Sequence, residues 1–253
     1  MVHDALRSQF ERDGFVIVRS FLDAADLAEL NHQLARYIRE VVPRQDGSHA
    51  FYLDASRPET LKQLHRMSVD PFFEQYRRHP LWQTLAEGLL GEAAEADDPE
   101  WFNKPAASNH PTPPHQDNYY FCLQPCQVAT IWLALDRVDE GNGCLRYVPG
   151  SHLRGVREHS VTSVLGFSQG ISDYSQADRR LEVPILLEPG DAVVHHGNAI
   201  HRANGNPSPD RDRRAFAMVY RGVSCRRDEA AYARYRAAFE QQHQQVAASA
   251  SGK

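Results

Sequence analysis

The chain has 253 residues, of which 42% are hydrophobic, and its formal net charge is -5 at pH 7. This size allows one sizeable hydrophobic core, so we expect a single domain over residues 1–245 and a flexible tail over 246–253. Lysine and arginine are scattered rather than clustered, which argues against nucleic acid or an anionic membrane surface as partners. Without a signal-peptide core, a membrane-spanning apolar run or a regular cysteine framework, the sequence predicts a cytoplasmic protein with reduced thiols.

The first part of the chain is predicted to be helical after one short strand at 14–21. Asp23 suits the position before a helix, because its carboxylate can accept from free backbone N–H groups of the first turn. Apolar residues then recur with helical spacing at Leu27, Leu30, Leu34 and Ile38. Further helices are predicted at 59–67, 71–78 and 81–90, with Gly91 ending the last one. We therefore expect a helical N-terminal part over about 22–91.

From about residue 100 the sequence changes to short runs rich in Val, Ile, Trp and Tyr that are separated by Pro and Gly. Such runs predict strands at 101–104, 119–123, 127–135, 144–148, 183–187, 191–196 and 215–221. Because no helices intervene, we expect a mainly β protein with flanking helices and an antiparallel sandwich or jelly-roll core over about 100–222. Good helix formers at 227–245 predict a closing surface helix.

A metal site is predicted from His115, Asp117 and His201. On an extended strand His115 and Asp117 would share one face of the sheet, and a later strand would supply His201. Two histidines and one carboxylate leave coordination positions open, as non-haem iron(II) oxygenases require. A His-x-Asp tripeptide is common, so the alternative is a hydrogen-bonded pair on a loop. His195 and His196 are interpreted as core or hydrogen-bonding residues.

Arginines follow His201 after a turn rich in Asn, Pro and Ser. A guanidinium is the suitable partner for the distal carboxylate of 2-oxoglutarate, because its planar fork donates two parallel hydrogen bonds. Arg213 and Arg214 would point to opposite faces of a strand, so only one of them can face the core. Arg211 is interpreted as part of a solvated turn.

Ordered motifs extend over most of the chain. They are Phe10–Val16, His115–Asp117, Ile131–Asp136, Glu140–Leu145, Val148–His152 and the segment from His201 to Arg213. In this order they resemble the phytanoyl-CoA dioxygenase superfamily, which includes ectoine hydroxylase and other small-molecule hydroxylases. Several motifs in order are far more specific than any one of them.

The resemblance implies a double-stranded β-helix of the jelly-roll or cupin-like type, in which His115, Asp117 and His201 bind iron(II). It also implies that an arginine after the distal histidine anchors 2-oxoglutarate. With one residue inserted after His201 the turn aligns and Arg213 takes the anchor position, with Arg214 as the alternative. The implied reaction is hydroxylation of an aliphatic C–H bond of a small molecule by dioxygen, with release of succinate and carbon dioxide.

Further residues are candidates for the cavity wall. Asn103, Lys104 and Thr130 could hydrogen-bond 2-oxoglutarate, and Trp132 is expected to pack beside it. Tyr119 and Phe121 would share the strand face of the metal motif, and the long segment 155–180 falls where the family carries its lid. The candidate substrate contacts are Tyr119, Phe121, Phe167, Gln169, Tyr174 and Arg202. The alternatives are ordinary core aromatics and a loop that only packs on the surface.

Three other functions compete with this interpretation. One is a cupin-type metal enzyme that does not use 2-oxoglutarate, for which the arginine would be unnecessary. Another is a non-catalytic jelly-roll protein that binds a metal, and the third is a structural interaction protein. The sequence predicts a small-molecule substrate without naming it, and it leaves monomer and homodimer open.

Overall fold

The computed structural model describes residues 2–162, 169–238 and 240. Its largest element is an antiparallel sheet with the strand order β1-β12-β7-β14-β5-β3-β2, and β4 also pairs with β14. The strands are β1 Phe15–Val18, β2 Ala50–Tyr52, β3 Leu61–Leu64, β4 Ala94–Ala96, β5 Glu100–Lys104, β7 Val128–Ala134, β12 Ala192–His196 and β14 Arg213–Gly222. Strands from the first hundred residues therefore extend the sheet at both edges.

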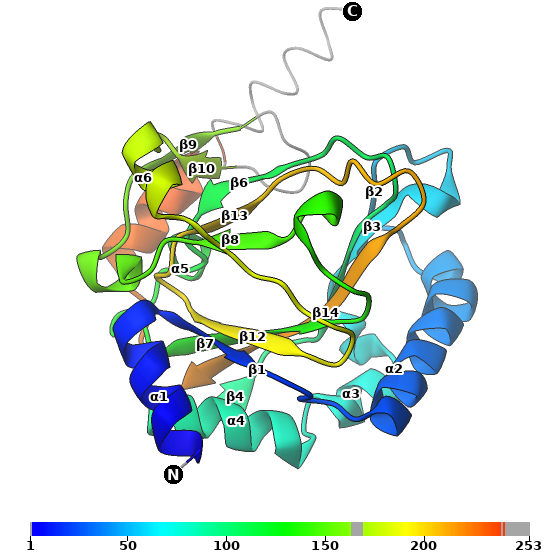
Figure 1. Cartoon of the computed structure of the whole chain (residues 1–253), viewed down its shortest axis with the longest axis horizontal. Coiled ribbons are helices and arrows are strands. Elements are labelled where there is room, and N and C mark those ends of the chain that lie inside the picture. The colour runs from blue at the N-terminus through cyan, green and yellow to red at the C-terminus, as the bar shows by residue number, and fades with distance from the viewer. Residues whose placement is uncertain (1, 163–168, 239, 241–253) are drawn as a thin grey trace, which may run out of the picture.

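A smaller antiparallel sheet lies over the large one, with the order β11-β8-β13-β6. Its strands are β6 Thr112–His115, β8 Leu145–Tyr147, β11 Val183–Pro184 and β13 His201–Ala203, and a separate hairpin pairs β9 His159–Val161 with β10 Gln169–Ile171. Figure 1 shows β6, β13 and β8 crossing above β7, β12 and β14. Apolar side chains such as Trp132, Tyr147 and Ile185 fill the space at one end between the two sheets.

Helices cover the outer face of the large sheet (Figure 1). They are α1 Val2–Asp13, α2 Ala24–Arg36, α3 Pro71–Tyr76 and α4 Pro80–Leu90, while α5 Asn118–Phe121 and α6 Gln176–Leu181 lie elsewhere. Trp82 and Phe216 are fully buried, and their rings meet edge to face where α4 packs on β14. The main hydrophobic core lies in this helix-sheet layer. The inner face of the sheet is therefore available for polar groups.

Local sequence signals account for most helix ends. The Asp23 carboxylate accepts from the backbone N–H groups of Ala25 and Asp26, as its N-cap position predicts. Gly91 ends α4 with φ +74°, a left-handed conformation that a glycine adopts without a steric penalty. The helix α1 was not predicted, and the predicted helix at 227–245 is observed over 229–238, with much of its remainder outside the described residues.

Two predicted elements are wrong. Residues 59–67 were expected to be helical, but Leu61–Leu64 form β3 and pair with both β2 and β5. Residues 119–123 were expected to be a strand, but Asn118–Phe121 form the short helix α5. In both places contacts with distant strands or a local turn override the residue preferences. The strand predicted at 183–187 is confirmed only over Val183–Pro184.

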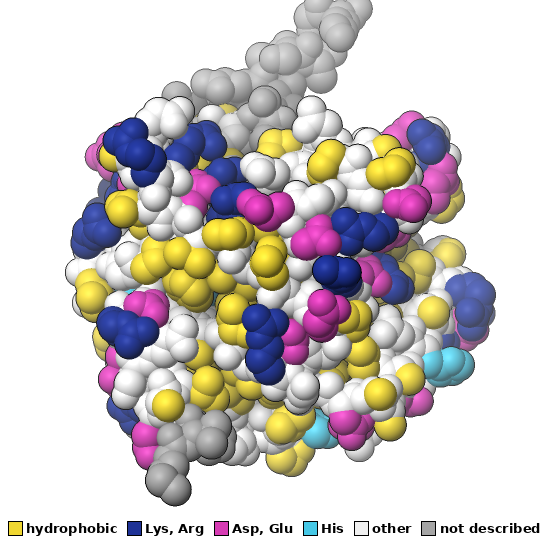
Figure 2. All heavy atoms as spheres, in the orientation of Figure 1, with side chains coloured by type: hydrophobic (Ala, Val, Ile, Leu, Met, Phe, Trp, Pro, Cys, Tyr) yellow, Lys and Arg dark blue, Asp and Glu magenta, His cyan; other side chains and the backbone are white. Residues whose placement is uncertain are grey.

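Surface charge is mixed on the face viewed in Figure 2, where Lys and Arg side chains alternate with Asp and Glu. This distribution agrees with the scattered charges of the sequence, and this face carries no broad patch of one sign. None of the helices in the described part of the chain is long and apolar enough to cross a membrane.

Candidate active site

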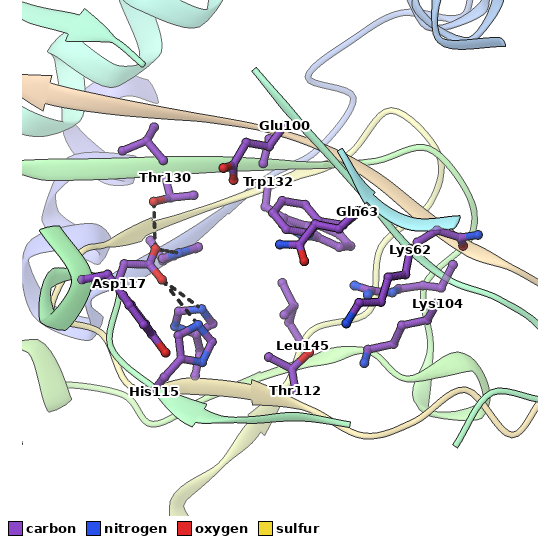
Figure 3. Close-up of a pocket in the computed structure, with 18 of the residues that line it drawn as sticks. Lys62, Gln63, Glu100, Lys104, Thr112, His115, Asp117, Thr130, Trp132 and Leu145 are labelled. Atoms are coloured by element: carbon purple, nitrogen blue, oxygen red, sulfur yellow. Dashed lines mark hydrogen bonds and ion pairs between the residues drawn. The ribbon is translucent and has the colours of Figure 1, made fainter. Parts of the chain in front are cut away.

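Three predicted metal ligands meet at the end of the small sheet. His115 is the last residue of β6 and His201 the first residue of β13, and the two are direct partners in the antiparallel register. Asp117 lies just before α5. One potential ligand atom from each of the three residues falls within 4.8 Å of the others, and Figure 3 labels two of them, His115 and Asp117. Two imidazoles and a carboxylate therefore converge on one point.

Backbone carbonyls set the orientation of both imidazoles. His115 Nδ1 lies 2.8 Å from the Pro113 carbonyl oxygen, and His201 Nδ1 lies 3.0 Å from that of Ala199. A carbonyl accepts only, so each Nδ1 carries the proton and each Nε2 carries the lone pair. The Nε2 atoms lie 3.5 and 3.6 Å from Asp117 Oδ1. Both rings therefore present a metal-binding nitrogen on the side of the carboxylate.

The Asp117 carboxylate is held from the large sheet. Thr130 Oγ1 donates to Asp117 Oδ2 at 3.1 Å, and His195 Nε2 lies 3.0 Å from the same oxygen. The Tyr147 hydroxyl lies 2.8 Å from His195 Nδ1 on the other side of that ring. Burial opposes ionisation of Asp117, but the neighbouring imidazoles outweigh it and hold the pKa of this carboxyl well below its usual value. Asp117 is therefore an oriented carboxylate at neutral pH.

The route by which Asp117 reaches this position differs from the prediction. His115 and Asp117 were expected on one face of a strand, but Asp117 has φ -59° and ψ -36°, so the chain has already turned into α5. The Asn118 side chain closes this turn by exchanging two 3.0 Å hydrogen bonds with the backbone of Leu123. The convergence of the two ligands therefore depends on the turn and not on strand alternation.

Gln116, between the two ligands, is fully buried and connects three segments. Its amide donates to the carbonyl oxygens of Gly155 and Asn198 at 2.8 and 2.7 Å, and its Oε1 accepts from the backbone N–H of Arg157 at 2.8 Å. These hydrogen bonds attach the metal motif to the segment before β9 and to the loop that leads to His201. The middle residue of the motif therefore contributes to its position.

A cavity of about 370 Å³ opens beside the three ligands. Arg213 lines it, is 4% exposed, and places its guanidinium carbon 5.0 Å from the centre of the Trp132 ring. Arg214 points to the other face of β14 and pairs with Asp136 at 2.6 Å. Burial lowers the pKa of Arg213 to about 10, so its guanidinium remains charged at neutral pH. Of the two candidate anchors, Arg213 is the one that faces the cavity.

Two lysines strengthen the positive charge at this end of the cavity. Lys104 lies opposite Arg213 in the register of β5 and β14, and its Nζ donates to the His110 carbonyl oxygen at 2.6 Å. Burial, followed by the charges of Arg213 and Lys62, holds the pKa of Lys104 well below its usual value. Burial alone lowers the pKa of Lys62 to about 8. Arg213 and the two lysines define a basic end that suits a carboxylate ligand, and Figure 3 shows Lys62 and Lys104 extending toward the cavity.

A family model of phytanoyl-CoA dioxygenase (PhyH) matches residues 10–215 of this chain. The chain belongs to this family. The peroxisomal phytanoyl-CoA dioxygenases of Bos taurus and Homo sapiens are each 25% identical to it over 233 residues, which covers 87% of this chain and 68% of each relative. The resemblance carried by the sequence motifs is thus confirmed.

Solved structures share the fold. EctD from S. alaskensis with 2-oxoglutarate and 5-hydroxyectoine superposes with a TM-score of 0.70 at 17% identity, over 86% of this chain and 75% of that one. The epimerase SnoN in complex with Fe3+, alpha ketoglutarate and nogalamycin RO gives 0.70 at 23% identity, over 88% and 85%. At these identities the likeness shows the fold alone. Family membership and the His-Asp-His cluster make the chain an iron- and 2-oxoglutarate-dependent dioxygenase, which confirms the predicted enzyme class and cofactors, with dioxygen as the oxidant.

The remaining candidates occupy different places in this dioxygenase. Asn103, Thr130, Trp132 and Phe121 line the cavity. Thr130 hydrogen-bonds the Asp117 carboxylate, so it acts on the metal site. Tyr119 does not line the cavity, whereas its neighbour Tyr120 does, because α5 replaces the expected strand and changes which side chains point inward.

The predicted lid contacts lie away from this cavity or outside the described residues. Gln169 is fully buried and receives the Tyr119 hydroxyl, and the Tyr174 hydroxyl donates to Glu182 at 2.6 Å. Arg202 directs its guanidinium to Glu182 on the opposite side of β13 from His201. Phe167 falls outside the described residues. None of the other three lines the cavity.

Sequence reasoning missed several cavity residues. They are Lys62, Gln63, Asp97, Asp98, Glu100 and Tyr120. Lys62 and Gln63 were missed because a helix was expected at 59–67. Glu100 had a usable signal, because it alternates with Phe102 and Lys104 along a strand whose other residues were predicted.

Proposed function

We propose that this dioxygenase hydroxylates an aliphatic C–H bond of a small-molecule metabolite. One oxygen atom of dioxygen enters the new hydroxyl group, while 2-oxoglutarate takes the other and becomes succinate and carbon dioxide. The observation that carries this proposal is that the three candidate ligands and the buried Arg213 line one and the same cavity. Nucleic acid is not part of the proposal.

The donor set suits iron(II). His115 and His201 present Nε2 lone pairs, and Asp117 presents an ionised oxygen that its neighbours orient. Three ligands on one side leave room for a bidentate co-substrate and for dioxygen. Bound iron would supply the activation of dioxygen. The protein supplies the ligand geometry and keeps the His201 imidazole neutral, because burial holds the pKa of His201 well below its usual value.

The basic end suits the distal carboxylate of 2-oxoglutarate. Arg213 can donate two parallel hydrogen bonds to a carboxylate, and its Nε has no hydrogen-bond partner among the described residues. Trp132 packs under the guanidinium and fixes its plane. We assign Arg213 as the anchor, Asn103 and Trp132 as neighbours of the co-substrate, and Thr130 as a residue that positions Asp117.

The substrate would occupy the part of the cavity that these groups leave open. With 2-oxoglutarate in place, a cavity of about 370 Å³ holds only a small molecule or the reacting end of a larger one. The mammalian relatives are phytanoyl-CoA dioxygenases, and EctD is seen with 5-hydroxyectoine. Phe121 and Tyr120 line the cavity close to the metal motif and are proposed to contact the substrate.

We also propose that the two facing sheets are the double-stranded β-helix of iron oxygenases and that residues 1–245 form one domain. The four cysteines are free, and the chain is proposed to work in a reducing compartment such as the cytoplasm. The named mammalian relatives are peroxisomal, so fractionation of cells that express the tagged protein would test the location.

A visible absorption spectrum tests the proposed use of iron(II) and 2-oxoglutarate. Protein prepared without oxygen receives iron(II) and then 2-oxoglutarate, and we expect a weak visible charge-transfer band of the chelate. His115→Ala should abolish the band, Arg213→Leu should weaken it, and Arg214→Leu should leave it unchanged. Absence of the band from folded, iron-loaded protein would favour a cupin-type enzyme that does not use 2-oxoglutarate, or a non-catalytic metal-binding protein.

A further inference from the structure

One wall of the cavity carries a charge opposite to that of the basic end. Asp97, Asp98 and Glu100 line it together with Arg221, which pairs with Asp97 at 2.6 Å. Burial raises the pKa of Asp97, Arg221 opposes this rise, and the charges of Glu100 and Asp98 add to it. The three carboxylates therefore act on one another and give this wall a negative potential.

The acidic wall and the basic end lie at opposite ends of strand β5. Glu100, Phe102 and Lys104 alternate along it, and all three line the cavity. Lys104 pairs in register with Arg213, whereas Glu100 pairs with Ala217. Four residues of strand span about 13 Å. A 2-oxoglutarate carboxylate at Arg213 would therefore lie far from the Glu100 carboxylate, which faces the space left for the substrate.

A buried amide points into the same space. Gln63 is only 6% exposed, and it lines the cavity. It lies opposite Phe102 in the register of β3 and β5, and Figure 3 shows its amide directed into the cavity. An amide that faces a cavity can both donate a hydrogen bond to a bound ligand and accept one from it. It is the kind of group that a polar ligand satisfies.

We propose that the substrate carries a positively charged nitrogen, which Glu100 binds and beside which the Gln63 amide accepts or donates a hydrogen bond. This inference rests on the proposed function, and it makes Glu100 and Gln63 specificity residues. One Glu100 oxygen contacts His65 Nδ1, which fixes the carboxylate from outside. Its other oxygen remains for the ligand.

The charge of the wall decides between substrate classes. An anionic substrate would meet three carboxylates at close range, and a neutral one would remove water from them without a compensating charge. A substrate with an ammonium or amidinium group would instead complete the pairing of Glu100 and gain a charge-assisted hydrogen bond. When 2-oxoglutarate occupies the basic end, a cationic substrate is therefore the class that fits the acidic wall.

The test uses two probes of the same shape, benzylamine, which is protonated at neutral pH, and benzyl alcohol. Calorimetric titration follows each probe in the metal-free protein and, without oxygen, in protein loaded with iron(II) and 2-oxoglutarate. We expect benzylamine to bind at least about tenfold more tightly than benzyl alcohol. Glu100→Gln should remove this preference, and Gln63→Leu should weaken benzylamine binding. Glu95→Gln, at an exposed position that does not line the cavity, should change neither.

Equal binding of the two probes to the wild type, or a preference that survives in folded Glu100→Gln, would overturn the inference. The two failures are separable. A normal 2-oxoglutarate band without amine preference rejects the cationic substrate and keeps the dioxygenase proposal. Amine binding that depends on Glu100 in metal-free protein, together with no 2-oxoglutarate band, rejects the proposed reaction and keeps the amine site.

Discussion

The two ends of the cavity are built on different principles. At the metal end each ligand side chain has a partner from the protein, because carbonyls hold both imidazoles and Thr130 with His195 holds Asp117. At the basic end Arg213 is buried and forms no ion pair within the described residues, and its guanidinium lies over the Trp132 ring. The first end is complete as a protein structure, whereas the second lacks a negative charge.

This difference shows which part of the site the fold stabilises without a bound ligand. Charges and hydrogen bonds in a buried position stabilise a protein only when they are paired. The metal end satisfies this condition for its carboxylate, so its geometry should persist without metal. The basic end is unfavourable until an anion binds, so part of the interaction energy of 2-oxoglutarate offsets a cost already present in the free protein.

The largest effect is expected from removal of a metal ligand. His201→Ala deletes one of the two imidazoles and should abolish iron binding and succinate release, a greater loss than the roughly 10- to 100-fold that follows loss of an outer partner. Iron(II) titration and a 2-oxoglutarate turnover assay measure both. His32→Ala, at an exposed position, is the control. Iron binding that survives in His201→Ala would remove this residue from the ligand set.

A smaller but still large effect is expected at the basic end. Arg213→Leu should weaken 2-oxoglutarate binding by about 2–5 kcal/mol, because the carboxylate would then be buried without its cation. Iron affinity should not change. Arg214→Leu removes a charge that pairs with Asp136, and 2-oxoglutarate affinity should stay within about twofold. If the two variants bind 2-oxoglutarate equally well, the anchor lies elsewhere.

The two ends also predict opposite effects on the metal-free protein. Loss of the unpaired buried charge in Arg213→Leu should raise its thermal midpoint, since an apolar side chain of similar reach fits the same place without a desolvation penalty. His201→Ala should lower the midpoint, because it leaves a cavity and an unpartnered Ala199 carbonyl oxygen. Calorimetry of both variants without metal tests this contrast. A lower midpoint in Arg213→Leu would show that the guanidinium already stabilises the free protein.

The next largest effect is expected from a change that removes a hydrogen bond orienting Asp117. Thr130→Val keeps the shape of the side chain but removes the hydroxyl that donates to Asp117 Oδ2. Iron(II) affinity should fall roughly 10- to 100-fold, with little change in 2-oxoglutarate affinity once iron is saturating. Thr112→Val, at another threonine of the cavity wall, should bind iron normally. Equal losses in both variants would indicate a general change of the cavity.

The sequence was sufficient for the parts of the site that depend on residue identity. The donor types at His115, Asp117 and His201 pointed to iron, and strand alternation predicted that only one of Arg213 and Arg214 faces the core. The strand β14 fulfils that alternation, with Arg213 inside and Arg214 on Asp136. These signals are local, and local periodicity survives in the fold.

The parts that depend on distant contacts were not predictable in this way. Residues 61–64 have a sequence that suits a helix, but pairing with β2 and β5 makes them a strand that brings Lys62 and Gln63 into the cavity. The position of Tyr119 changed for a local reason, because the Asn118 side chain closes a helical turn. Both errors affected the cavity wall, where a strand paired on both sides and a short helix replace the elements that the local sequence favours.

The smallest predicted effect is a pH dependence that belongs to the basic end alone. Burial lowers the pKa of Lys62 from 10.5 to about 8, so its amine is charged below that pH and neutral above it. The affinity for 2-oxoglutarate should therefore fall several-fold as pH rises through about 8, while iron affinity does not follow the same curve. Lys62→Met should bind 2-oxoglutarate more weakly at pH 7 and lose this step.

Stability should change with pH in the opposite sense. Between about pH 8 and 10.5 the unfolded chain binds the Lys62 proton and the folded chain does not, so the free energy of unfolding of the metal-free protein rises across this window. In Lys62→Met this rise should be absent. Saturating 2-oxoglutarate should also reduce it, because the dianion keeps the amine charged in the folded protein. Denaturant titrations of both proteins at pH 7 and pH 9.5, with and without 2-oxoglutarate, measure the difference. An identical pH dependence in wild type and variant would show that burial does not lower the pKa of Lys62 in the folded protein, and the contrast between the two ends would then rest on Arg213 alone.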